Sequence, residues 1–185
     1  MAPVSARYLE LAGQPKRELD AVFAGGSPPD ASALTGYEFR GYNQPRATAL
    51  LGIRKFIKAF YIHASGQPFG CNTPVTQNGL AGEWLARPSA ERPKRYAFFQ
   101  VEPADPRAPD DLRHGAALLD YGRGGNRAYD IARILRDYLV RVEPGSDELL
   151  LGKAFFVVAG TRLADSFFLI ERYRPLADAE ALANR

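Results

Sequence analysis

The chain has 185 residues, of which 46% are hydrophobic and 24% are charged, as is typical of one soluble globular domain with a sizeable core. An aromatic content of 11%, together with 14 prolines and 17 glycines, favours strands and turns over an all-helical bundle. The net charge of +3 comes from 24 basic against 21 acidic residues, a surplus too small to indicate a dedicated nucleic-acid-binding protein.

Cysteine and histidine are scarce, which limits metal and redox chemistry. Cys71 is the single cysteine, so an internal disulfide is impossible, and its glycine and asparagine neighbours suggest partial exposure. His63 and His114 lack the spacing of metal ligands. Residues 1–19 lack the apolar core of a signal peptide, and no segment reads as a transmembrane helix. The sequence therefore predicts a cytoplasmic protein without metal, cofactor or membrane partner.

The first 33 residues form an N-terminal helical segment followed by a linker. Residues 6–23 show a helical pattern that Gly13 and Pro15 divide in two, and 25–30 (GGSPPD) is a linker that leads to one short helical turn. We expect the body of the protein over 34–175 and a helical tail over 176–185.

The body opens with alternation typical of strands. Residues 36–42 (GYEFRGY) alternate, and 43–45 end that strand. Two interpretations compete over 46–62. Ile53, Phe56, Ile57, Phe60 and Tyr61 match a helix, whereas Arg54, Phe56, Lys58, Phe60 and Ile62 match a strand. We favour a short helix over 46–52 followed by a strand, because Gly52 and the β-branched and aromatic residues after it suit that division.

The middle of the chain is rich in glycine and proline. Residues 65–95 allow only short strands, 94–102 (KRYAFFQVE) and 115–121 (GAALLDY) are further strands, and 103–113 is a polar loop. An anion-binding nest and an ordinary turn both fit 122–127 (GRGGNR), and the turn is the simpler interpretation. A helical turn is expected over 128–133.

Residues 135–175 predict three consecutive strands joined by short turns. Tyr138 and Val140 share one face of the first strand and Asp137 and Leu139 the other. The run 149–158 is apolar on both faces, with a glycine bulge possible at Gly152, and 166–173 alternates up to a terminating proline. An antiparallel meander with two apolar faces needs closure or a covering element, so we predict a mainly β fold, a single antiparallel β-barrel with helical segments at both ends.

The segments 36–42 (GYEFRGY) and 54–60 (RKFIKAF) resemble the first part of bacterial lipocalin-like (calycin-type) β-barrel proteins. The resemblance extends over 34–175, but the Gly-x-Trp signature of true lipocalins is missing, with Phe39 near the position of its tryptophan. It implies a barrel that carries a small apolar ligand.

The leading functional hypothesis is that the barrel interior binds a small hydrophobic or amphipathic molecule, because aromatic residues are abundant on these strands. A barrel of this size filled by its own side chains is the alternative. The residues expected to line the cavity are Phe39, Phe56, Phe60, Tyr96, Phe98, Tyr138, Phe155, Phe168 and Arg172.

Two other hypotheses use the same elements. A cofactor-free isomerase, cyclase or dehydratase would employ Tyr138, Arg136, Asp120 or His114 as acid, base or charge stabiliser, although a cross-strand ion pair on the outer face also explains Arg136. A structural or interaction module would instead form a homodimer through exposed aromatic residues such as Phe69, Trp84 and Tyr129, although Trp84 is most simply a packing residue that plugs or covers the barrel.

Overall fold

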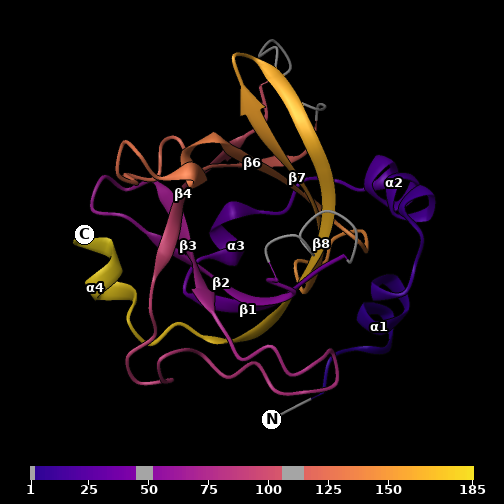
Figure 1. The fold of residues 1–185 in the computed structure, drawn as a ribbon, viewed down its shortest axis with the longest axis horizontal. Coiled ribbons are helices and arrows are strands. Elements are labelled where there is room, and N and C mark those ends of the chain that lie inside the picture. Colours follow the sequence, from indigo (N-terminus) through magenta and orange to yellow (C-terminus); the bar gives the residue numbers. More distant parts are fainter. Residues whose placement is uncertain (1–2, 45–51, 106–114) are drawn as a thin grey trace.

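Eight antiparallel strands close into a barrel in the computed structural model, which describes residues 3–44, 52–105 and 115–185 (Figure 1). Each strand pairs with the next along the chain, and β1 closes the barrel by pairing with β8. The strands are β1 (Tyr37–Asn43), β2 (Lys55–Ile62), β3 (Pro68–Pro74), β4 (Tyr96–Pro103), β5 (Ala117–Asp120), β6 (Leu135–Arg141), β7 (Leu149–Val158) and β8 (Thr161–Pro175). The predicted antiparallel barrel is confirmed.

Short helices surround the barrel. They are α1 (Ala6–Ala12), α2 (Lys16–Gly25), α3 (Ala31–Leu34), the 3-10 helix η2 (Ile131–Ile134) and α4 (Ala179–Ala183). The Ser5 hydroxyl caps α1 by accepting a hydrogen bond from the Tyr8 amide. Figure 1 shows α1 and α2 on one side of the barrel and α4 on the opposite side. Within the described residues, no helix has the length and apolar character needed to cross a membrane.

The bounds of most predicted helices and strands agree with those in the structure. The strand after Gly52 is β2, and the glycine- and proline-rich segment contains β3. The final strand begins at Thr161, five residues before the predicted start at Ser166, because it forms a long hairpin with β7. Some predictions lie outside the described residues. These are His114, all but the last residue of the helix predicted over 46–52, and most of the loop predicted over 103–113.

Apolar side chains lie on both sides of the barrel wall. Inside, the ring centroid of Phe60 lies 5.3 Å from that of Phe39 and 5.6 Å from that of Phe99, and these rings fill one end together with Leu34 of α3. Outside, α1 and α2 cover a second apolar layer in which Phe23 packs on Phe167 of β8. The two-sided apolar character of β6 to β8 therefore has a direct cause, since one face meets the interior and the other meets the helices.

Two glycines make room for aromatic rings inside the barrel. A Cβ atom on Gly41 would lie 2.3 Å from the Phe56 ring, and one on Gly152 would lie 2.1 Å from the Phe168 ring. Gly152 is thus required by the close approach of the Phe168 ring. The irregular pairing of β7 with β8 is not at Gly152 but between Ala154 and Phe156.

The segment 122–127 is a turn that supports strand β4. The Asn126 side chain accepts from the Phe98 amide at 2.9 Å and donates to the Phe98 carbonyl at 2.6 Å. These two hydrogen bonds take the place of those that the backbone of a neighbouring strand would make. Ala97, just before, has a φ of 47°, where the pairing of β3 with β4 shifts register. The turn thereby fixes the irregular start of β4, which carries Tyr96 and Ala97.

The expected partial exposure of Cys71 is wrong, because this residue lies on the outward face of β3 in an apolar cluster that includes Leu176 and Leu182. Burial raises the pKa of the Cys71 thiol from 9.0 to about 12. The unfolded chain therefore loses the thiol proton at lower pH than the folded chain, so this group destabilises the fold as pH rises from about 9 to about 12. We expect iodoacetamide at pH 8 to leave the native thiol unmodified and to alkylate it in urea, as measured by intact-protein mass spectrometry. Rapid alkylation of the native protein would contradict the buried position.

Candidate ligand-binding site

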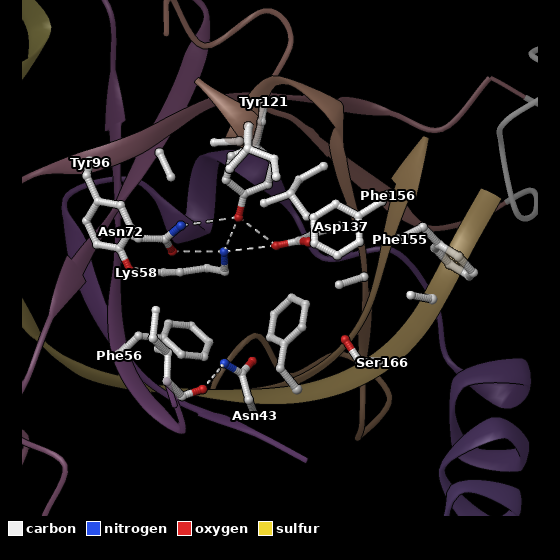
Figure 2. Close-up of a pocket in the computed structure, with 18 of the residues that line it drawn as sticks. Asn43, Phe56, Lys58, Asn72, Tyr96, Tyr121, Asp137, Phe155, Phe156 and Ser166 are labelled. Carbon is white, nitrogen blue, oxygen red and sulfur yellow. Dashed lines mark hydrogen bonds and ion pairs between the residues drawn. The ribbon is translucent and has the colours of Figure 1, made fainter. Parts of the chain in front are cut away.

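The barrel interior holds a cavity of about 370 Å³ away from the packed phenylalanines, and Figure 2 shows residues that line it. This volume lies within the range typical of small-molecule sites. Ile53 and Ile131, which are 37% and 70% exposed, mark its mouth. The apolar lining residues are Ile53, Phe56, Ala97, Ile131, Ala132, Leu135, Ala154, Phe155, Phe156, Ala164 and Phe168, and the polar ones are Asn43, Lys58, Asn72, Tyr96, Tyr121, Asp130, Asp137 and Ser166.

Four polar side chains form a connected network on one wall of this cavity, as Figure 2 shows. The Lys58 ammonium donates to Asn72 Oδ1 at 3.0 Å, to the Tyr121 hydroxyl at 2.6 Å and to Asp137 Oδ2 at 3.0 Å. The Tyr121 hydroxyl donates to the same carboxylate oxygen at 2.7 Å. All three ammonium protons are therefore used, and the network has no net charge when Lys58 and Asp137 are ionised.

Strand pairing brings these four side chains together. Lys58 on β2 pairs directly with Asn72 on β3, Tyr121 directly follows β5, and Asp137 lies on the neighbouring strand β6. Each side chain points inward because alternate residues of a strand face opposite sides. The network thus depends on the curvature of the barrel, since its members come from three strands and from the residue that follows β5.

The network is almost fully buried, and burial shifts its pKa values. Burial lowers the pKa of Lys58, while the Asp137 carboxylate opposes part of that shift. Burial also raises the pKa of Tyr121 well above its usual range, and the charge of Asp137 raises it further. The phenol consequently stays protonated and serves as a donor. The Lys58 nitrogen lies 4.9 to 5.4 Å from the ring centroids of Phe56, Phe99, Tyr121 and Phe168, which favours a cation at this place.

Three polar groups of the cavity have unused hydrogen-bonding capacity. Asp137 Oδ1, the Tyr96 hydroxyl and the Ser166 hydroxyl line the cavity and make no hydrogen bond within the part of the chain that the structure describes. Burial raises the pKa of Tyr96, so this phenol also keeps its proton. A bound molecule could donate to the carboxylate and exchange hydrogen bonds with either hydroxyl. Among the described residues, no group of three His, Cys, Asp or Glu side chains is arranged to hold a metal ion.

The structure brings some of the residues expected at the site into this cavity and places others elsewhere. Phe56, Tyr96, Phe155 and Phe168 line it. Phe39 and Phe60 are inside the barrel but belong to its packed end. Arg172 extends toward the same end, where it pairs with Glu148 at 2.7 Å and donates to the Ala33 carbonyl at 3.0 Å.

Phe98 and Tyr138 lie on the outer side of the barrel wall. Phe98 belongs to the apolar cluster beside α4, and the Arg185 guanidinium lies 3.4 Å from its ring centroid. Tyr138 belongs to the outer layer covered by α1 and α2, so neither residue lines the cavity. On β6 it is Asp137, on the opposite face from Tyr138, that points inward.

Of the acid–base residues expected from the sequence, Tyr138, Arg136 and Asp120 lie within the described part of the chain, and these three do not converge on the cavity. Arg136 pairs with Asp120 at 3.1 Å on the outer face, as the ion-pair interpretation anticipates. Sequence reasoning missed Lys58, Asn72, Tyr121 and Asp137 as a group. One signal was present, because a strand over β2 places Lys58 on the same face as Phe56 and Phe60.

Trp84 is a packing residue, as its simplest interpretation predicts, and it is not the exposed aromatic that the interaction-module hypothesis requires. Its side chain is 5% exposed, its indole donates to the Gly41 carbonyl at 3.0 Å, and its ring packs against Tyr8 of α1. The Lys55 ammonium lies 3.9 Å from the centroid of the Trp84 ring. Trp84 therefore fixes the connection between β3 and β4 against the barrel wall. Tyr129, another of the three expected aromatics, is 81% exposed.

The fold and the cavity define the class of protein as a closed eight-stranded antiparallel barrel with an internal site, an architecture compatible with a lipocalin-like fold. No protein-family model matches the chain, and no curated protein matches it. The function must therefore be inferred from the site itself.

Proposed function

We propose that the barrel binds one small, mostly apolar molecule whose single polar end contacts the network around Asp137. The observation that carries this proposal is a buried ion pair that faces a mostly apolar cavity. Well-packed apolar residues in place of a buried ion pair are often as stabilising or more so, so stability alone gives little reason for one here. A role in orienting a ligand does give a reason, because a few polar groups in an apolar pocket fix a ligand's orientation.

The chemistry of the cavity limits the ligand. Aromatic rings of Phe56, Phe156 and Phe168 favour a flat or unsaturated apolar body. Asp137 Oδ1 accepts from a hydroxyl or an amine N–H, since a carboxylate only accepts, and the Tyr96 and Ser166 hydroxyls can donate to a carbonyl oxygen of the ligand. This interpretation makes the protein a carrier in the manner of lipocalin-like barrels, with a small amphipathic molecule as its partner.

Titration with N-phenyl-1-naphthylamine tests the proposal, because this probe is apolar, aromatic and carries one N–H donor. We expect its fluorescence to rise and saturate at one molecule per chain, with a dissociation constant on the order of micromolar, which corresponds to about 8 kcal/mol. A fluorescence signal that never saturates, or that is absent from the folded protein, would contradict the proposal.

A further inference from the structure

A primary amine inside a ligand cavity can react with a carbonyl group of the ligand as well as contact it. The chain has lysines at positions 16, 55, 58, 94 and 153, and Lys58 is the one that lines the cavity. Its nitrogen lies at the polar wall, within hydrogen-bond distance of a carboxylate and a phenol. A carbonyl group at the polar end of a ligand would approach this amine directly.

The surroundings of Lys58 suit the product of such a reaction. An amine and a carbonyl compound form an imine, and its protonated form, the iminium, has the same charge as the ammonium it replaces. The Asp137 carboxylate at 3.0 Å and the four rings around the nitrogen would stabilise either cation. Burial lowers the pKa of Lys58, which makes the neutral, nucleophilic amine more accessible.

We propose that Lys58 forms a reversible imine with an aldehyde or ketone held in the cavity. This inference rests on the proposed binding function and specifies the chemical class of its ligand. The overall reaction converts the Lys58 ammonium and a carbonyl compound into a protonated iminium and one water molecule. It requires no oxidant, reductant or other co-reactant.

Each step uses groups that already touch Lys58. Asp137 accepts a proton from the ammonium, and the free amine then forms a bond between its nitrogen and the carbonyl carbon. A proton moves from that nitrogen to the former carbonyl oxygen, with the Tyr121 hydroxyl placed to relay it. Protonated Asp137 returns its proton to the resulting hydroxyl, the C–O bond breaks and water leaves. The carboxylate of Asp137 then faces the iminium as its counter-ion.

The other lysines provide internal controls. The Lys55 ammonium donates to four oxygens, among them the Gly82 carbonyl at 2.6 Å, and Lys153 pairs with Asp20 at 2.6 Å on the outer surface. Lys94 is exposed on the connection before β4. Lys55 is buried outside the cavity, whereas Lys94 is exposed, so modification of these amines would not depend on the cavity.

The experiment treats the protein with cinnamaldehyde, reduces the mixture with sodium cyanoborohydride, and locates the adduct by peptide mass spectrometry. We expect one cinnamyl group, mapped to Lys58 and formed at least about tenfold faster than the adduct on Lys94. Lys58→Arg keeps the positive charge and should remove this adduct, whereas Lys94→Arg should leave it unchanged. Labelling confined to exposed lysines would overturn the inference, and the wild-type map settles this even if Lys58→Arg fails to fold.

Cinnamyl alcohol, which has the same skeleton without the carbonyl, separates the inference from the function on which it rests. If the alcohol displaces N-phenyl-1-naphthylamine but the aldehyde gives no adduct on Lys58, the imine is wrong and the binding function stands. If neither compound enters the cavity, both proposals fail. Displacement by the alcohol together with an adduct on Lys58 supports both.

Discussion

Replacement of Asp137 with alanine is expected to lower the free energy of unfolding by about 3–5 kcal/mol, because it leaves the Lys58 ammonium buried without its counter-charge. The double replacement Lys58→Met with Asp137→Leu removes both charges and fills the space with apolar atoms. We expect this double variant to be as stable as the wild type to within about 1 kcal/mol, since apolar replacement of a buried pair is often neutral or stabilising. Urea unfolding followed by the fluorescence of Trp84 measures both values.

Glu10→Ala is the matched control for this comparison. Glu10 pairs with Arg7 at 2.6 Å on the exposed face of helix α1, so its loss should change stability by no more than about 1 kcal/mol. If the charge-free double variant were as unstable as Asp137→Ala, the ion pair would be required for folding. A role in holding a ligand would then no longer be needed to explain the ion pair. If the double variant folds, its affinity for N-phenyl-1-naphthylamine should fall, because the acceptor at Asp137 is gone.

Replacement of Ala154 with phenylalanine is expected to reduce the affinity for N-phenyl-1-naphthylamine by at least about tenfold, or about 1.4 kcal/mol. Ala154 pairs with Asp137 on one neighbouring strand and with Ser166 on the other, and all three line the cavity. A ring at this position would take up space that the ligand needs. The space is empty of protein atoms, so we expect a smaller effect on stability than the roughly 1–3 kcal/mol seen when a packed core is overfilled.

The control for this substitution is Ala90→Phe, which adds the same ring at an exposed position on the connection between β3 and β4. It should leave both the affinity and the free energy of unfolding unchanged. Equal probe binding by Ala154→Phe and the wild type would mean that the probe binds elsewhere, and the cavity would then not be the site.

The sequence was sufficient to predict the barrel because a two-residue period is a local property. Alternation over β1, β6 and β8 and short turns between β6, β7 and β8 indicate a meander, and two apolar faces require closure. Because both faces are apolar, the sequence did not show which face lines the cavity. On β6, both the face of Tyr138 and Val140 and the face of Asp137 and Leu139 are buried, the first under helices and the second inside the barrel.

The polar network could not be predicted for a second reason, which is that its members are distant in sequence. Lys58 and Asp137 are 79 positions apart, and Asn72 lies in a segment where glycine and proline obscure the strand period. Only the strand register of the closed barrel brings the Lys58 nitrogen to 3.0 Å from Asp137 Oδ2. The one local clue was an inward lysine between Phe56 and Phe60. An unpaired charge in that position would be too costly to bury, so this lysine indicates a buried partner.

A crystal structure of the protein with N-phenyl-1-naphthylamine is the most direct test of the central claim. We predict that the probe lies inside the barrel, with its rings against Phe56 and Phe168 and its N–H donating to Asp137. A probe bound only on the outer surface, or an interior closed by the protein's own side chains, would contradict the account.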